Sequence, residues 1–397
     1  METKTFFFRT IKPACFLCLV VMTCHLQPVS GKEKAEGRGS KEKGKAAASL
    51  SDEEGAASAV SFEKLLLDNP MDRNIYNAYA QSLVGEKKFD EAIEVYRRAL
   101  LLNEELTNNK GTPLSEAIEE VYALKNFSEA MEKEPSWGLA QKISFTGGEL
   151  VTNIPQEYSA PLVQDLALLM SEEKTLLEEI LGPPRGEEPF LKISVAGRPE
   201  EYKDLWKEKN FSPKRLSSGA YSIGENEIVV FFTGTDVRWT LAHELAHCFL
   251  REYYIKQPSL FLDEGIANYI SFKLAKAGAK PLVEELVGWL KDLRKEGKLD
   301  MALDLFPAWE RYEQAPETEE KMEFYLRTWS LTAFFREGGN AFFSKFFRDF
   351  LQYELEMGPL SRKDVENYFR GNLPEETARE LDAAWGQFIE KMDYDNI

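Results

Sequence analysis

Two histidines of this chain, His243 and His247, stand four positions apart with Glu244 directly after the first. Residues i and i+4 of an α-helix project from the same face, so the spacing predicts that both imidazoles point the same way. Glu244 then reaches the edge of that face. Two ring nitrogens beside a carboxylate are the groups of a catalytic zinc site, so the pattern favours a helix that carries a metal centre.

A third ligand follows in the apolar stretch Pro258 to Tyr269, where Glu264 precedes a glycine. A helix in this stretch can return alongside the histidine pair and close a site of two histidines and one glutamate. Such a site leaves one tetrahedral position open for water. The alternative is that Asp263 and Glu264 are acids at a helix N-terminus, where the helix dipole favours negative charge.

The segments HELAH and LDEGIANY resemble the gluzincin metallopeptidases, specifically their peptidase-MA-like branch. The resemblance implies that His243, His247 and Glu264 bind Zn²⁺ and that Glu244 is the general base. Zinc-activated water would then hydrolyse peptide bonds in a peptide or protein substrate. The implied fold class is α+β, with a zincin-like catalytic domain that combines a small mixed sheet, an active-site helix and a mostly helical C-terminal half.

Thermolysin-like relatives place an aspartate four positions after the glutamate ligand, where it orients a ligand histidine. This chain has Asn268 at that position. The side-chain carbonyl of Asn268 could accept a ring N–H, although a neutral acceptor raises the basicity of the ligand less than a carboxylate does. Asp263 is a second candidate, and the sequence does not choose between them.

A later segment, Phe324 to Phe335, resembles the helix that follows the zinc site in some members of this branch. The resemblance implies that Tyr325 hydrogen-bonds the oxyanion as it forms. The alternative is that these aromatic residues, which recur at helical spacing, belong to the core.

The formal charge of −18 makes the chain a poor ligand for nucleic acid, which is itself polyanionic. Residues 1–30 combine basic residues, an apolar run and small residues before Gly31, which predicts a signal peptide and an exported protein. The location would be periplasmic, cell-surface or secreted. Cys24 ends a loose lipoprotein cleavage box, so a lipid anchor at Cys24 is an alternative to plain cleavage.

Residues 31–60 have the composition of a solvated, disordered linker. Residues 61–140 are expected to be helical, and Asn74 to Leu102 resembles one tetratricopeptide repeat with small residues at Ala80, Ala92 and Ala99. A second complete copy is not evident. One repeat does not make a binding superhelix, so structural packing and recognition of a protein partner both stay open.

The catalytic domain is expected to span residues 141–397. Apolar patterning predicts strands at 149–154, 191–195 and 227–232, and helices at 159–181 and 199–206. The helix with the histidine pair comes next, and the chain from residue 281 onward is expected to be helical. The strand at 227–232 or its neighbour is expected at the cleft edge, where an extended peptide can add to it by backbone hydrogen bonds. Gly219 to Ser222 is expected to form the rim of the cleft. Cys248 is expected to be a buried spectator.

Two other classes of function compete with the hydrolase. One is a non-catalytic exported scaffold that binds a partner through the helical repeat and keeps a vestigial zinc site. The intact Glu244 argues against it. The other is an exported structural protein without a metal, in which both histidines of the pair lie on the surface.

Overall fold

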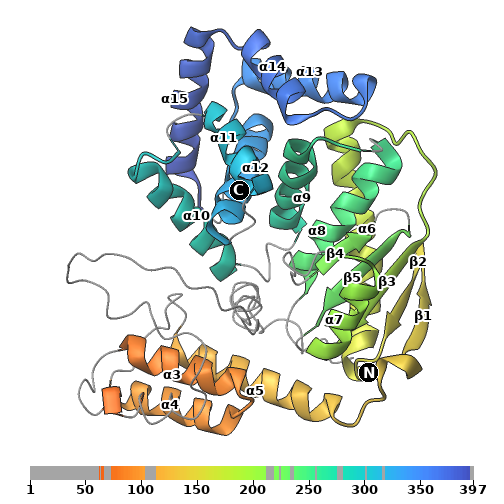
Figure 1. Ribbon diagram of the computed structural model, residues 1–397, viewed down its shortest axis with the longest axis vertical. Helices are drawn as coiled ribbons and strands as arrows, with labels where there is room; N and C mark the ends of the chain where they lie inside the picture. Colours follow the sequence, from red (N-terminus) through yellow and green to blue (C-terminus); the bar gives the residue numbers. More distant parts are fainter. Residues whose placement is uncertain are drawn as a thin grey trace, which may run out of the picture. The chain divides into compact units, whose positions relative to one another are not determined.

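The computed structural model describes residues 62, 64–66, 73–102, 113–211, 219–222, 225–232, 237–254, 257–274, 280–299, 302–314 and 318–393. The described part of the chain divides into a smaller unit that ends at Lys125 and a larger one that begins at Asn126 (Figure 1). The predicted signal peptide, Cys24 and the predicted linker at 31–60 lie outside the described residues. They stay predictions.

In the smaller unit, the predicted hairpin consists of α3 (Arg73–Gly85) and α4 (Phe89–Leu102). The small residues Ala80, Ala92 and Ala99 are fully buried between these helices, as the repeat pattern requires. A third helix, α5 (Leu114–Met131), lies within the region 61–140 that was expected to be helical, and it adds Leu114 to the same apolar cluster.

The two units divide inside α5, earlier than the expected boundary at residue 141. The reason is that the last turns of α5 pack within the larger unit. The ring of Phe127 lies edge-on to Tyr158 and Phe232, with centroids 5.1 and 5.2 Å away. The guanidinium of Arg198 donates hydrogen bonds to the carbonyl oxygens of Met131 and Glu134, at 2.6 and 2.7 Å.

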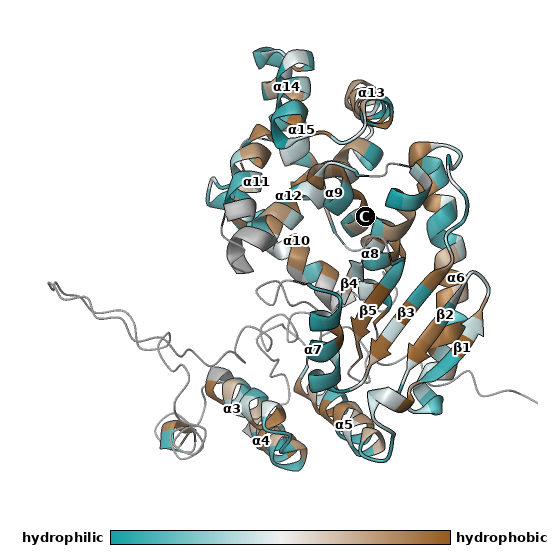
Figure 2. Cartoon of the chain, turned by 45° about the vertical axis from the view of Figure 1, so that its right-hand side comes forward, coloured by the Kyte–Doolittle hydropathy of each residue, from teal (hydrophilic) through white to brown (hydrophobic). Residues whose placement is uncertain are grey.

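The larger unit contains one five-stranded mixed sheet in the order β1-β2-β3-β5-β4. Strands β2, β3 and β5 run parallel, whereas β1 and β4 pair antiparallel at the two edges. Buried parallel strands are rich in Val, Ile and Leu, and these residues led the sequence pattern to β2, β3 and β5. Figure 2 shows hydrophobic residues along β3 and β5. The bounds are β1 (Gln141–Phe145), β2 (Gly148–Thr152), β3 (Leu191–Ala196), β4 (Gly219–Ser222) and β5 (Glu227–Phe231).

Three helices pack against this sheet: α6 (Gln156–Leu181), α7 (Pro199–Glu208) and α8 (Arg238–Phe249). Successive strand residues point to opposite faces. In β4, Ala220 packs in the apolar cluster of α7, whereas the neighbouring Gly219 lies against Thr240 of α8. Helices α7 and α8 therefore cover opposite faces, and α6 packs beside α8.

The remaining helices form the C-terminal part of the chain (Figure 1). After α8 comes a π-helical turn, Leu250–Tyr254. Then follow α9 (Leu260–Leu274), α10 (Lys280–Lys295), α11 (Leu305–Gln314), α12 (Thr318–Glu337), α13 (Ala341–Met357), α14 (Arg362–Asn372) and α15 (Glu375–Lys391). The described residues are thus mostly helical with one small mixed sheet, which agrees with the α+β class.

Helix α9 lies between α8 and α12, and every residue from Phe261 to Phe272 is buried. A helix that is enclosed on all sides is held in one position by its neighbours. A Cβ on Gly265 would lie 2.6 Å from Oγ1 of Thr332, so glycine is what allows α12 to approach this closely. Farther along, Phe272 stacks on Trp329 with the centroids 3.5 Å apart. These contacts fix the position of Glu264, next to Gly265.

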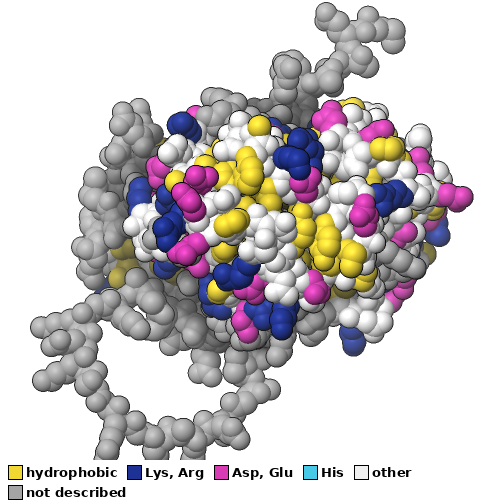
Figure 3. All heavy atoms as spheres, turned by 90° about the horizontal axis from the view of Figure 1, so that it is seen from above, with side chains coloured by type: hydrophobic (Ala, Val, Ile, Leu, Met, Phe, Trp, Pro, Cys, Tyr) yellow, Lys and Arg dark blue, Asp and Glu magenta, His cyan; other side chains and the backbone are white. Residues whose placement is uncertain are grey.

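No helix in the described part of the chain is both long and apolar enough to cross a membrane. The face seen in Figure 3 carries acidic and basic side chains interspersed with apolar ones, and neither charge gathers into a large patch there.

Candidate metal centre

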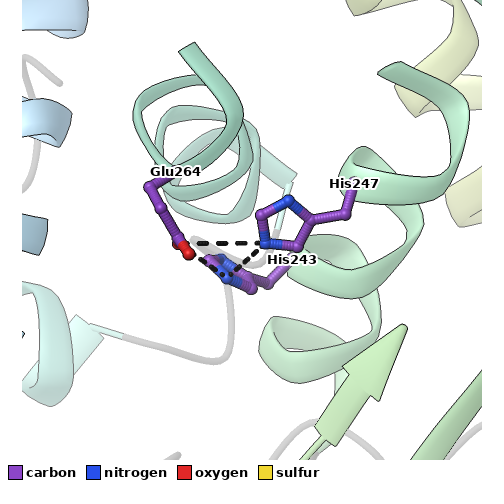
Figure 4. Close-up of side chains that lie close together, drawn as sticks. All are labelled: His243, His247 and Glu264. Carbon is purple, nitrogen blue, oxygen red and sulfur yellow. Dashed lines mark hydrogen bonds and ion pairs between the residues drawn. The ribbon is translucent and has the colours of Figure 1, made fainter. Parts of the chain in front are cut away.

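The two histidines of α8 point in the same direction, as their spacing predicts (Figure 4). The Nε2 atoms of His243 and His247 lie 3.1 Å apart, and the ring centroids lie 4.6 Å apart. His247 is buried and His243 is half-buried. The pair therefore lies within the fold, and the interpretation of both histidines as surface residues is wrong.

Glu264 extends from α9 toward both rings (Figure 4). Its Oε2 atom lies 3.5 Å from Nε2 of His243 and 3.8 Å from Nε2 of His247. Tetrahedral zinc, with bonds of about 2.0–2.1 Å to nitrogen and oxygen, would separate its ligand atoms by about 3.3 Å. The three separations lie close to that value, so a single small cation fits the triad with little movement of side chains.

The Oε2 atom of Glu264 is buried and accepts no hydrogen bond from the described residues. Burial would raise the pKa of this carboxyl group, but the neighbouring rings of His243 and His247 outweigh burial and lower it. The group therefore stays ionised at neutral pH. A buried carboxylate oxygen without a donor costs free energy, and a cation beside it would remove that cost.

Asp263, rather than Asn268, contacts His247, one of the two candidate ligand histidines. Its Oδ1 atom lies 2.8 Å from Nδ1 of His247, so the ring can donate its Nδ1–H there and direct the Nε2 lone pair toward the triad. Asn268 instead donates a hydrogen bond from Nδ2 to the backbone carbonyl of Glu264, at 2.8 Å.

Arg251 donates a hydrogen bond from its Nη2 atom to the other carboxylate oxygen of Asp263, Oδ2. Burial alone would raise the pKa of Asp263, but His247 and Arg251 together lower it to about 2. Burial alone would likewise lower the pKa of His247, but the surrounding carboxylates, with Asp263 foremost, raise it to about 9. The pocket thus favours a positive charge at His247. The sequence analysis missed Arg251, although its place four residues after His247 on the same helical face was a usable signal.

Replacing Asp263 with asparagine is expected to weaken zinc binding by about 10- to 100-fold. The amide can still accept the hydrogen bond from His247, but it no longer makes the ring more basic or pairs with Arg251. The affinity can be measured by competition with a chromophoric chelator. The exposed Asp292→Asn on α10 serves as the control, and an affinity for Asp263→Asn equal to that of the wild type would contradict this role.

Glu244 is buried on α8, beside the edge strand β4. A Cβ on Gly219 would lie 3.1 Å from Cγ of Glu244 and 2.5 Å from Cγ2 of Thr240, so a side chain at position 219 would crowd this acid. The backbone of β4 therefore runs directly past the Glu244 carboxylate. This places the predicted rim segment, Gly219–Ser222, next to the predicted base.

Tyr325 of α12 also reaches the triad. Its hydroxyl donates a hydrogen bond of 3.4 Å to Oε1 of Glu264, and its ring centroid lies 6.3 Å from that of His243. Burial and then the charge of Glu264 raise its pKa well above the usual value, so the phenol keeps its proton. Tyr312 of α11 packs against it with the centroids 5.9 Å apart. No motif in the sequence pointed to Tyr312.

Cys248 follows the second histidine but takes no part in the triad. It is fully buried, and burial raises the pKa of its thiol to about 12. The thiol therefore stays protonated and unreactive at neutral pH, in agreement with the prediction of a buried spectator.

A scan against models of known protein families finds no match to this chain. A search of curated proteins likewise finds no match.

Proposed function

We propose that this protein is an exported zinc metallopeptidase that hydrolyses peptide bonds in a zincin-like domain. In this proposal His243, His247 and Glu264 hold the zinc ion and Glu244 is the general base. The observation that supports it most is the convergence of two imidazole nitrogens and one carboxylate oxygen from α8 and α9 within 4.8 Å of one another. Such chemistry also needs a base beside the triad, and Glu244 lies on α8 with the two histidines.

The donor set favours zinc over other common cations. Calcium and magnesium prefer six or more oxygen ligands, whereas two imidazoles and one carboxylate suit zinc. Three protein ligands also leave a position free, which is the arrangement of catalytic rather than structural zinc sites. When bound, zinc would lower the pKa of water and polarise a carbonyl group.

Glu244 and Tyr325 have separate roles in the proposed reaction. The Glu244 carboxylate accepts a proton from water as the water oxygen attacks the carbonyl carbon of the substrate. It then gives that proton to the amine nitrogen as the C–N bond breaks. This leaves a carboxylic acid and an amine, which become a carboxylate and an ammonium ion when the second proton of the water passes from the acid to the amine. Tyr325, which keeps its proton, donates a hydrogen bond to the carbonyl oxygen as negative charge develops there.

Strand β4 offers a way to orient a peptide. It is an edge strand that, among the described residues, pairs with β5 alone, and Gly219 in it lies beside Glu244. An extended peptide that adds to such an edge is held by backbone hydrogen bonds, whatever its side chains. The scissile bond could then lie next to the base.

The direct test of this function is hydrolysis of fluorescently labelled casein by the full chain after loading with zinc. We expect cleavage of casein that a chelator abolishes and that added zinc restores. Zinc binding without hydrolysis of any peptide or protein substrate would instead favour the non-catalytic scaffold.

Replacing Tyr325 with phenylalanine is expected to lower kcat by about 10²- to 10³-fold, because one donor to the oxyanion is lost. The zinc content should not change, since the tyrosine hydroxyl is not a ligand. Kinetics on a quenched fluorescent peptide would measure the effect, with Tyr353→Phe on α13 as the control. An unchanged kcat would return Tyr325 to the alternative role of a core aromatic.

A further inference from the structure

Helix α9, which supplies Glu264, begins at a buried serine. Ser259 is 2% exposed. Its carbonyl oxygen accepts the hydrogen bond from the backbone N–H of Asp263 at 2.9 Å, and its Oγ accepts from the N–H of Leu262 at 3.4 Å. Ser259 therefore caps the helix. Through the first of these bonds its position is linked directly to that of Asp263, the partner of His247.

A carboxylate from a distant helix holds this serine. Glu354 of α13 lies 95 residues away in the sequence and is completely buried. Its Oε1 atom accepts from the backbone N–H of Ser259, and its Oε2 atom accepts from the hydroxyl at 2.8 Å. In the described part of the chain no cation pairs with Glu354. Its charge is instead compensated by these two donors at the N-terminus of α9.

Aromatic packing holds the same turn of α9. The ring of Phe261 lies 5.9 Å from that of Phe350 on α13 and 5.6 Å from that of Phe369 on α14. The apolar contacts fix the helix against its neighbours, but they have no directional preference along its axis. The two hydrogen bonds from Ser259 to Glu354 are directional, and they set the position of the helix N-terminus along the helix axis.

We propose that Glu354 is a positioning residue for the metal centre. Its carboxylate anchors the start of α9 through Ser259, and this determines where Asp263 and Glu264 meet the two histidines. The inference depends on the proposed function only in that the triad binds a metal ion, not in that the protein is a peptidase.

The protonation state of Glu354 gives a way to separate this role from ordinary packing. Burial raises its pKa, the two hydrogen bonds from Ser259 offset part of that rise, and the charge of Asp263 on α9 adds to it, so the pKa is about 7. Above pH 7 both oxygens accept from Ser259. Below pH 7 one oxygen carries a proton and cannot accept, so the anchor is weaker.

The test compares wild type with Glu354→Gln and with Glu356→Gln, an exposed acid two residues further along the same helix. Zinc affinity of the full chain is measured by competition with a chelator at pH 6 and at pH 8. In Glu354→Gln, one acceptor becomes an NH₂ group that faces a donor of Ser259. We expect its affinity to be at least about tenfold below that of wild type at pH 8. At pH 6 the zinc affinities of wild type and Glu354→Gln should be almost equal, so their ratio should approach one. The control Glu356→Gln should have the affinity of wild type at both pH values.

The histidines titrate in both proteins. Dividing the zinc affinity of wild type by that of Glu354→Gln at the same pH therefore cancels the effect of histidine titration. Equal affinities at pH 8, or a ratio that does not change with pH, would overturn the positioning role even if Glu354→Gln lowers the melting temperature. Should Glu354→Gln fail to fold, Ser259→Ala removes the hydroxyl donor alone and is expected to weaken zinc binding severalfold at pH 8. An unchanged zinc affinity in Ser259→Ala would also overturn the positioning role. If wild type itself binds no zinc, both the positioning role and the proposed function are overturned.

Discussion

The variant Glu244→Gln is expected to retain zinc and to lose hydrolysis, with a rate at least about 100-fold below that of wild type. The amide has almost the same shape as the carboxylate but cannot accept a proton from water. Glu244 does not supply any of the three atoms of the triad, which come from His243, His247 and Glu264. Catalysis and metal binding should therefore separate in this variant.

The measurement is zinc content by mass spectrometry after gel filtration, together with casein hydrolysis on the same sample. Glu179→Gln, an exposed acid on α6, is the matched control and should behave as wild type. Undiminished hydrolysis by Glu244→Gln would contradict the assignment of the base. Zinc in both proteins with hydrolysis by neither would favour the scaffold.

The variant His247→Ala is expected to lose its zinc, from about one ion per chain to almost none after gel filtration. Removing an outer partner such as Asp263 costs about 10- to 100-fold in affinity, so removing a ligand itself should cost more than 100-fold. The variant keeps Asp263 and Glu264 as buried acids on α9, now without the histidine that lowers the pKa of both. Their mutual repulsion should also lower the melting temperature of the metal-free protein.

Glu244→Gln serves as the control for this variant, because it changes the same helix and keeps the triad. Metal analysis and chelator competition on the two proteins should therefore differ sharply. A full complement of zinc in His247→Ala would show that the ion binds elsewhere in the chain.

The sequence predicted those parts of the site that depend on local periodicity. The orientation of His243 and His247 follows from the helical repeat alone, because the two rings share one helix. The strand at 191–196 was found because its first five residues alternate between apolar and polar side chains, and the strand at 227–231 because it is a short apolar run before Gly234. The position of Glu264 was predicted through the family resemblance, and the structure brings it to the histidines.

The parts that the sequence could not predict depend on contacts between distant elements. Both Asp263 and Asn268 were reasonable partners for a ligand histidine, and only the rotation of α9 against α8 places Asp263 there. Nothing local pairs Glu354 with Ser259, because 95 residues separate them. The bounds of α5 were not predicted separately within the helical region 61–140, because only a few of its residues are buried, although Leu114, Ala117 and Val121 do recur at helical spacing.

The most direct test of the central claim is to locate the metal by anomalous X-ray scattering at the zinc edge, using crystals of the zinc-loaded protein. We expect one strong peak about 2 Å from Nε2 of His243, from Nε2 of His247 and from a carboxylate oxygen of Glu264. A peak at any other place, or a zinc ion on the histidines with Glu264 turned away from it, would show that these three residues do not form the zinc site.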